Sequence, residues 1–439
     1  MKRQMHLGLF LLGTGSHTGG WRHPGATRSF QDIDTVLEIA RAAEDAKFDL
    51  IFMGDNLNAD PKGHPSFTLR LEPLTLLAAV AVATKKIGLG ATVSTTFSDP
   101  FTVARAFASL DHISHGRAAW NAVTTANASA SVNFGIDHPD HARRYERAGE
   151  FVDVVRGLWD CWDDDAIVAD AATGLYIDPQ KLHPLDHEGT FFKVRGPINI
   201  GRAPQGQPVL LQAGGSEAGI ALAARTADVV FSVVQDFEEA CVAYAQVKDS
   251  LPRYGRRPDD VTVIPGVMPV VGRTDREAFD KLAVLQGYTA GGSGINVLSE
   301  RFGIDLSAYD LDGPVPELPL SDHYHSFTRV LLSKARRENM TLRDLYHLTV
   351  AARGHWVLCG SAESVADTLQ HWFENGAADG FNIMPATHPH GFDDFTQMVV
   401  PILQERGLFR LDYEGDTLRD HLGLARPPVA RTSAQRKAS

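Results

Sequence analysis

The stretch PVLLQAGGSEAGIALAARTADVVFS, residues 208–232, decides how the rest of the chain is interpreted. Its first apolar run ends at Gly214-Gly215-Ser216, an alanine-rich segment follows, and a second apolar run begins after Asp228. This order predicts a strand, a tight turn, a helix and a second strand. The free N–H groups and the positive dipole end at the start of such a helix form a site for an anion. The alternative is a turn in which Ser216 only caps the helix.

The turn at 214–216 does not match the common nucleotide-binding motifs. No Gly-Lys-Ser/Thr sequence follows Gly219, so the turn is not a P-loop. The glycine spacing does not satisfy Gly-x-Gly-x-x-Gly either, which argues against a dinucleotide-binding fold. The stretch therefore indicates a phosphate-sized anion site without naming its ligand.

The same strand and helix alternation extends over the chain in both directions. Seven segments show helical periodicity: Ile33–Lys47, Glu72–Thr84, Pro100–Ser114, His141–Trp162, Ser216–Thr226, Phe237–Arg253 and Ala362–Asn375. Eight short runs are almost continuously apolar, as parallel strands covered by helices are: MHLGLFLL (5–12), FDLIFMGD (48–55), IGLGATVS (87–94), RAAWNAVT (117–124), PVLLQAG (208–214), DVVFSVV (228–234), TVIPGVMPVV (262–271) and GFNIMPA (380–386). This pattern predicts an α/β fold of the (β/α)8 TIM-barrel type, with a doubly wound sheet as the alternative.

Two long segments, 163–206 and 290–340, interrupt the alternation. Both are too long for plain connections, so we expect them to be insertions over the mouth formed by the carboxyl ends of the strands. The remainder predicts one barrel domain over residues 1–427. Residues 428–439 are expected to be a flexible tail.

Composition limits the classes of partner. The net charge of −12 argues against nucleic acid or an anionic membrane as the main partner, because both bind basic surfaces. The longest apolar stretch, near 74–84, is too short to span a bilayer. The three cysteines are far apart in sequence, which favours a reducing cytoplasm without a disulfide framework.

The residues at the expected strand ends are mostly neutral hydrogen-bonding groups. Met53-Gly54-Asp55, Ser94-Thr95-Thr96 and Trp120-Asn121 contain no lysine placed for a Schiff base and no cluster of metal ligands. A barrel with such ends fits a bound cofactor that brings the reactive atoms, while the protein orients it and excludes water. The alternative is a barrel whose catalytic residues lie in the two insertions.

Further candidate residues lie on one helix and among the histidines. His141 and Tyr145 are four residues apart near a helix start, so both can reach a phosphate or a ring edge, or simply anchor the helix. No histidine has a metal-binding spacing, and we expect no metal site. The histidines expected to line a substrate pocket are His17, His64, His138 and His323.

Several stretches together resemble one known family. They are GATVSTTFSDPFTVARAFASLDHISHGRAAWNAVTT, HARRYERAGEFVDVVRGLWDCW, PVLLQAGGSEAGIALAARTADVVF, AADGFNIMP, MVVPILQERGLFR and TLRDHLGLARP. They are similar to the nitrilotriacetate and dibenzothiophene-sulfone monooxygenase branch of the bacterial luciferase-like flavoproteins, from about residue 5 to 427. The resemblance implies a TIM barrel that takes reduced FMN from a separate NAD(P)H:flavin reductase. It also implies that O2 adds at the flavin C4a position and that the peroxyflavin oxidises a small organic substrate.

The resemblance also implies a set of FMN contacts. The phosphate is expected at Ser216 and Gly215 and the ribityl–phosphate arm at His141 and Tyr145. Asp55 is expected in the flavin pocket, and Thr95 and Asn121 near the ring. Ala142 or Arg143 fills a slot in which this branch usually carries an acidic residue. Association as a homodimer or homotetramer is implied as well.

Three other functions remain open from the sequence. They are a luciferase-like oxidoreductase that transfers hydride without oxygen, a flavin-binding protein without turnover, and a phosphate-binding barrel such as an isomerase. The catalytic residues and the substrate stay unassigned.

Overall fold

Eight parallel strands close into a barrel. The computed structural model describes residues 3–61, 63–289, 295, 298–299, 302–318 and 325–429. Around the barrel the strand order is β1-β2-β3-β4-β9-β10-β11-β13, and β13 pairs with β1 to close the ring. The strands are β1 (His6–Phe10), β2 (Leu50–Met53), β3 (Gly88–Ser94), β4 (Ala118–Val123), β9 (Val209–Ala213), β10 (Val229–Ser232), β11 (Thr262–Gly272) and β13 (Gly380–Ile383). Each lies within or overlaps one of the eight predicted runs, so the predicted TIM barrel is confirmed.

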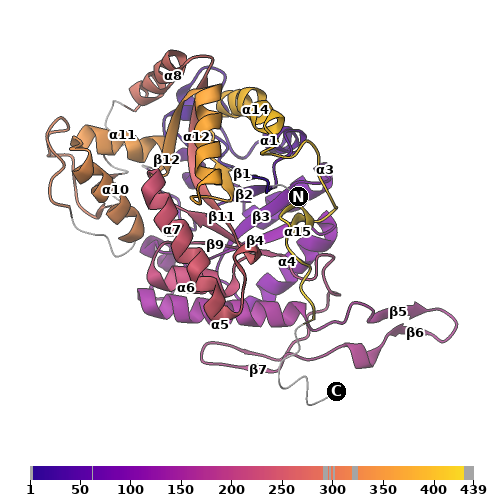
Figure 1. Ribbon diagram of the computed structural model, residues 1–439. Helices are drawn as coiled ribbons and strands as arrows, with labels where there is room; N and C mark the ends of the chain where they lie inside the picture. The colour runs from indigo at the N-terminus through magenta and orange to yellow at the C-terminus, as the bar shows by residue number, and fades with distance from the viewer. Residues whose placement is uncertain are drawn as a thin grey trace.

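Helices surround the barrel (Figure 1). The seven predicted helices are present: α1 (Ile33–Asp45), α3 (Pro73–Ala83), α4 (Pro100–Ser114), α5 (His141–Trp159), α6 (Glu217–Thr226), α7 (Phe237–Ser250) and α12 (Ala362–Glu374). Side-chain caps explain where several of them begin. Asp99, for example, accepts a hydrogen bond from Thr102 N at 2.9 Å, directly before Pro100.

The alternation of side chains along each strand separates two apolar layers. In β2, Ile51 and Met53 pack outward against the helices, while Leu50 and Phe52 point into the barrel. Both layers exclude water, which is why the strands are apolar almost without interruption. The same alternation decides which polar side chains at the strand ends can face the interior.

Other elements were not predicted. A further strand, β12 (Trp356–Ser361), pairs with the second half of β11, from Val267 to Gly272. Helices missed by the sequence analysis are α2 (Pro65–Thr68), α8 (Asp275–Gly287), α10 (His325–Arg337), α11 (Leu342–Ala352), α13 (His390–Asp394), α14 (Val400–Glu405) and α15 (Leu418–His421). A π-helical turn, Phe395–Val399, joins α13 to α14.

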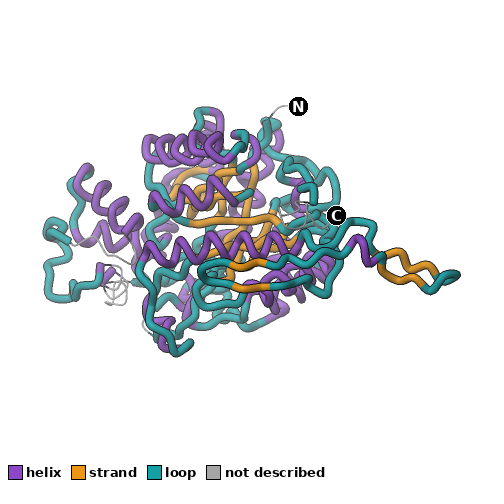
Figure 2. The backbone as a smooth tube through the Cα atoms, turned by 90° about the horizontal axis from the view of Figure 1, so that it is seen from below, coloured by secondary structure: helices purple, strands orange, loops and turns teal. Residues whose placement is uncertain are grey.

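The first insertion, 163–206, does not cover the mouth, and this expectation is corrected. It follows the C-terminal end of α5 and leads into the start of β9, so it lies at the amino ends of the strands. Gln205 confirms this position, because its Nε2 donates to the carbonyl of Ala118 at the start of β4 at 2.7 Å. The segment forms two hairpins, β5 (Ile167–Asp170) with β6 (Leu175–Ile177), and β7 (His187–Glu188) with β8 (Lys193–Val194). The β5–β6 hairpin projects away from the barrel (Figures 1 and 2).

The described part of the second insertion, 290–340, lies on the other side of the molecule and reaches the mouth (Figures 1 and 2). Leu298, Phe302, Leu331 and Leu345 belong to a separate apolar cluster that joins the insertion to α11. Arg329, Val330 and Ser333 of α10 line the cavity at the mouth. For this segment the expected position is confirmed.

Buried ion pairs fasten the C-terminal segment across the amino ends of the strands. Arg410 pairs with Asp49 directly before β2, and Arg419 pairs with Asp228 directly before β10 at 2.9 Å. The mouth at the opposite end is left open to ligands. The predicted tail falls almost entirely outside the described residues, which end at residue 429. Among the described helices, none has both the length and the apolar character needed to cross a membrane.

Candidate active site at the carboxyl ends of the strands

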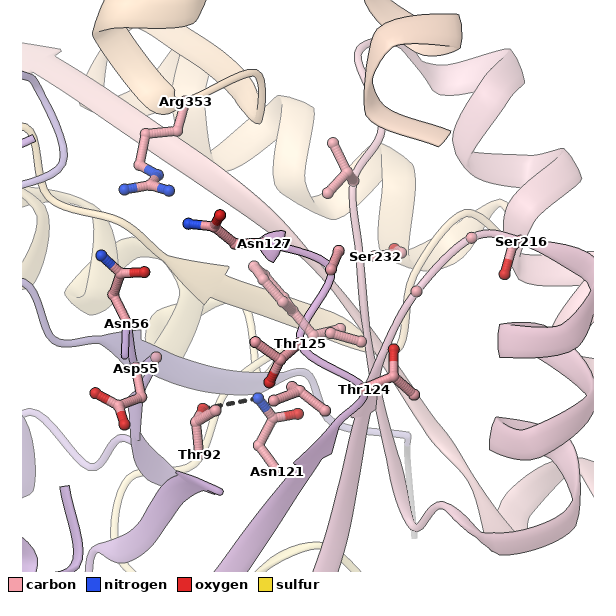
Figure 3. Close-up of a pocket in the computed structure, with 18 of the residues that line it drawn as sticks. Asp55, Asn56, Thr92, Asn121, Thr124, Thr125, Asn127, Ser216, Ser232 and Arg353 are labelled. Atoms are coloured by element: carbon pink, nitrogen blue, oxygen red, sulfur yellow. Dashed lines mark hydrogen bonds between the residues drawn. The ribbon is translucent and has the colours of Figure 1, made fainter. Parts of the chain in front are cut away.

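A cavity of about 800 Å³ opens at the carboxyl ends of the strands (Figure 3). Its walls come from the ends of β1, β2, β3, β4, β9 and β10 and from the starts of α5 and α6. Barrel enzymes place their chemistry at this end. The cavity is therefore the candidate active site.

One side of the cavity is the start of α6. Ser216 is the N-cap, and its Oγ accepts a hydrogen bond from Gly219 N at 3.1 Å. The backbone of Gly214 has φ +148°, which other residues rarely adopt, and a Cβ there would lie 3.2 Å from Tyr145 Oη. A Cβ on Gly219 would lie 3.1 Å from the same hydroxyl. The Tyr145 hydroxyl thus packs against the glycine turn, and the two elements form one polar pocket.

The start of α5 completes this pocket. His141 is the first residue of the helix, and its ring centroid lies 4.7 Å from that of Tyr145. Both side chains line the cavity together with Gly215 and Ser216, as the sequence predicts. Arg144 lines it too and was not assigned a role from sequence, although it shares the first turns of the same helix. Two helix N-termini and one arginine therefore face the same place, which favours an anion.

The centre of the cavity carries a pair of neutral polar side chains. Asn121 Nδ2 donates to Thr92 Oγ1 at 2.8 Å (Figure 3). Asn121 Oδ1 is buried and has no hydrogen-bond partner within the described residues. A buried acceptor without a donor is costly, so a ligand N–H or O–H is the natural partner for this atom.

Thr95 differs from its expected position, because it is not among the residues that line the cavity. Its backbone N and its Oγ1 both donate to the carbonyl of Val123, at 2.8 and 3.1 Å. Residues two apart on a strand share a face, so Thr92 and Ser94 of β3 face the cavity instead. The two-residue period of a strand is the sequence signal that predicts this orientation of Thr92 and Ser94.

Asp55 lines the cavity at the end of β2, as predicted. Burial raises the pKa of its carboxyl, and Arg70 opposes this effect, with Nε 3.9 Å from Asp55 Oδ1. The Arg70 guanidinium is buried and lies 4.9 Å from the centre of the Phe67 ring. Asp55 thus keeps a proton to higher pH than an ordinary aspartate.

The four histidines predicted to line a substrate pocket do not lie together at the cavity. His64 lines the cavity and caps α2, accepting from Ser66 N at Nδ1, and its Nε2 lies 3.1 Å from Ser16 O. His17 is fully buried beside the cavity without lining it. Burial lowers the pKa of each of these two imidazoles to about 3. His138 bonds Thr125 O at 3.0 Å outside the lining, and His323 lies outside the described residues.

Aromatic rings form the apolar floor. The Phe10 and Phe52 centroids are 5.1 Å apart, and Phe231 lies within 6 Å of both. Phe231 also stacks on His355 at 5.0 Å. Within the described residues, no group of three or more His, Cys, Asp or Glu side chains is arranged to hold a metal ion. The site therefore combines an anion pocket, a buried neutral acceptor and an apolar floor.

Comparisons with known proteins find relatives over almost the whole chain. N-acetyl-S-(2-succino)cysteine monooxygenase of Bacillus subtilis (strain 168) is 47% identical over 431 residues, covering 97% of this chain and 98% of the relative. Nitrilotriacetate monooxygenase component A of Aminobacter aminovorans is 45% identical, with 97% of each chain covered. The crystal structure of a riboflavin lyase with a modified FMN and riboflavin superimposes with a TM-score of 0.84 at 31% identity, covering 96% of each chain.

The resemblance to the nitrilotriacetate branch is thereby confirmed. The model of the luciferase-like monooxygenase family matches residues 5–379. The chain belongs to the luciferase-like monooxygenase family, and it is a monooxygenase.

Proposed function

We propose that this protein is the oxygenase of a two-component system that uses reduced FMN and O2 to oxidise a small organic molecule. The observation that carries the proposal is that one cavity holds both the anion pocket at Ser216 and the buried Asn121 Oδ1, which has no hydrogen-bond partner in the described part of the chain. A phosphate-bearing ring compound with an N–H edge satisfies both. The related riboflavin lyase contains a modified FMN, and the name of the nitrilotriacetate relative marks it as one component of several, which supports a separate NAD(P)H:flavin reductase.

The residues around the cavity fit FMN in a defined order. Ser216 and Gly215, with the free N–H groups of α6, would bind the phosphate. His141 and Tyr145 would hold the phosphate end of the ribityl chain. Asn121 Oδ1 would accept a hydrogen bond from the ring, and Asp55 lines the same part of the cavity.

Reduced FMN, when bound, supplies the electrons that activate O2 for insertion of one oxygen atom into the substrate. The protein's own part is to bind, orient and exclude water. Phe10, Phe52 and Phe231 exclude water from the floor. Thr92 holds the Asn121 amide in place through the 2.8 Å hydrogen bond. Burial raises the pKa of the Asp55 carboxyl, so this side chain of the cavity keeps a proton to higher pH than an ordinary aspartate does.

The test is turnover with separately supplied reduced FMN. The purified protein is mixed with a flavin reductase, NADH, FMN and a panel of sulfones, thioethers and aminopolycarboxylates, and O2 uptake and product mass are followed. We expect oxygenated product only when the reductase and O2 are both present. Reduction of FMN by the protein alone with NADH would contradict the two-component assignment. Product formation under strict anaerobiosis would instead indicate hydride transfer, and flavin binding without product would indicate a non-catalytic flavin protein.

A further inference from the structure

Arg70 lies directly behind the wall of the cavity. Asp55 and Phe67 line the cavity, whereas Arg70, on the segment between α2 and α3, does not. The Arg70 side chain is only 5% exposed, and its Nε lies 3.9 Å from Asp55 Oδ1. Figure 3 shows Asp55 across the cavity from Ser216. The charge of Arg70 can therefore act on a ligand in the cavity through Asp55, without touching that ligand.

The Arg70 guanidinium lacks the hydrogen bonds that a buried arginine normally makes. A guanidinium carries five N–H donors, and none of the three nitrogens of Arg70 has a hydrogen-bond partner within the described residues. Two aromatic rings lie beside it, with centroids 4.9 Å away for Phe67 and 5.8 Å away for Phe30. Burial lowers the pKa of Arg70 to about 10, so its side chain remains charged at neutral pH.

Another buried arginine shows what a structural role requires in this fold. Arg117 Nη1 donates to the carbonyl of Ile87 at 2.7 Å, and its Nη2 donates to that of Ala81 at 2.8 Å. Its Nε donates to Ser114 O at 2.7 Å, so Arg117 ties α3, α4 and the start of β3 together. Arg70 joins no elements by hydrogen bonds in the part of the chain that the structure describes. A structural role therefore leaves its buried charge unexplained.

The charges that act on Asp55 oppose one another. Burial has the largest effect and raises the pKa of the Asp55 carboxyl, and the negative charge of Glu72 adds to this effect. Arg70 and a hydrogen bond from the backbone of Asn56 lower the same pKa. Arg70 is thus the positive charge in this balance, and it favours the ionised carboxyl.

Two further titratable or charged groups lie close to this pair. His64 caps α2, and burial lowers the pKa of its imidazole to about 3, so the ring is neutral. Arg353, directly after α11, contacts the Phe67 ring as Arg70 does, with its guanidinium carbon 3.7 Å from the centroid. The charge of Arg353 also acts on the His64 imidazole. The cation that forms an ion pair with Asp55 is Arg70.

We propose that Arg70 is a positioning residue of the active site, whose charge decides whether the Asp55 carboxyl meets a bound ligand ionised or protonated. An ionised carboxyl only accepts hydrogen bonds, whereas a protonated one also donates. Arg70 favours the ionised form, because an opposite charge within about 4–6 Å stabilises it. The inference rests on the proposed function only for the identity of the ligand, FMN.

The first test is a double-mutant cycle in urea unfolding of the flavin-free protein, between pH 8 and pH 4.5. Arg70→Met removes the charge without removing a hydrogen bond to any described residue, and Asp55→Asn removes the carboxylate. At pH 8 we expect Arg70→Met to raise the equilibrium constant for unfolding about 10-fold more in the wild-type background than in Asp55→Asn. This difference should shrink as the pH falls, because a protonated Asp55 no longer interacts with the charge. Equal effects of Arg70→Met in the two backgrounds would reject the proposal.

The second test is the affinity for oxidised FMN against pH, measured by fluorescence titration without substrate or reductase. An ionised carboxyl in the cavity disfavours the negatively charged FMN, so affinity should fall as Asp55 ionises. We expect the midpoint of this fall to move up by about one pH unit in Arg70→Met and to return to its wild-type value in Arg70→Lys. In Asp55→Asn this fall should be absent.

The matched control is Arg28→Gln, which removes an exposed arginine from the segment after β1 and should keep the wild-type midpoint. The proposal is rejected if wild type shows no such fall, or if Arg70→Met leaves the midpoint in place. If the wild-type protein binds no FMN at any pH, the flavin assignment fails. The unfolding cycle, which needs no flavin, then decides the role of Arg70 by itself.

Discussion

Ser216 has both a structural role and a proposed role in binding phosphate. Ser216 Oγ caps α6 through Gly219 N, and the same residue lines the cavity beside Tyr145 and Gly215. The cap satisfies one of the free N–H groups at the helix start, and the others remain to bind an anion. Because the residue has these two roles, a substitution must preserve the cap if it is to test the phosphate site.

Ser216→Asp preserves the cap, since aspartate is as good an N-cap as serine, and adds a negative charge where the phosphate is proposed. We expect FMN affinity to fall at least about 100-fold, because two like charges about 4 Å apart repel by roughly 4 kcal/mol at an effective dielectric constant near 20. Riboflavin, which lacks the phosphate, should bind within about threefold of wild type. Fluorescence titration with both flavins measures this. Unchanged FMN affinity would show that the phosphate binds elsewhere, and equal loss for both flavins would indicate a distorted cavity.

At the scale of the element, local signals were sufficient for most of the fold and for many of the residues that line the cavity. Helix α4 begins at Pro100 because Asp99 caps it, and both residues are visible in the sequence. Thr92 and Ser94 face the cavity in place of Thr95 because Leu89, Ala91 and Val93, on the other face of β3, pack against the outer apolar layer. Arg353, which also lines the cavity, could not be predicted this way, because it follows α11, a helix that the sequence pattern does not reveal.

For the first insertion, the order of helices and strands along the chain is enough to predict the end of the barrel at which it lies. A segment between a helix and the following strand lies at the amino ends of the strands, so 163–206, between α5 and β9, cannot cover the mouth. The described part of 290–340 differs because α10 returns to the mouth before α11. The β5–β6 hairpin, with Ile167 and Tyr176 53% and 67% exposed, is therefore remote from the chemistry.

We predict that replacing residues 168–176 by a short glycine-containing turn leaves FMN affinity and kcat/KM within about twofold of wild type. Among the strands that the structure describes, β5 and β6 pair only with each other, so their loss should not move β9 or α5. Steady-state kinetics with the reductase present measures the effect. The contrasting change is Val330→Ala with Ser333→Ala in α10, which should raise KM. A large fall in kcat/KM for the hairpin variant alone would show that this segment acts on the site after all.

At the scale of the whole molecule, the barrel is held by contacts that no local pattern reveals. Asp49 is completely buried, and although burial alone would raise its pKa, Arg410 and His6 lower it overall. The partners are 361 residues apart in sequence, so the pairing of Asp49 with Arg410 depends on closure of the fold. Several histidines are likewise buried only because of tertiary packing: His17, His64, His388 and His421.

These histidines make stability depend on pH. Burial lowers the pKa to about 3 in His17 and His64 and to about 4 in His388 and His421, against about 6.5 in an unfolded chain. Below pH 6.5 the unfolded state takes up protons that the folded state does not, so the free energy of unfolding falls as pH decreases toward 4. Each such group contributes up to about 1.4 kcal/mol per pH unit in that window, and its full contribution is present above pH 6.5.

His388→Leu is the sharpest test of this dependence. Neither ring nitrogen of His388 has a hydrogen-bond partner within the described residues, so the change removes a protonatable group and no hydrogen bond. Urea unfolding at several pH values between 7.5 and 4.5 gives the free energy of unfolding at each pH. Its slope against pH should be smaller in the variant than in wild type, by the amount that about one bound proton contributes. His115→Asn, at an exposed position with φ +59° that asparagine tolerates, should keep the wild-type slope. If His388→Leu kept the full slope, His388 would have to be protonated in the folded protein, contrary to its burial.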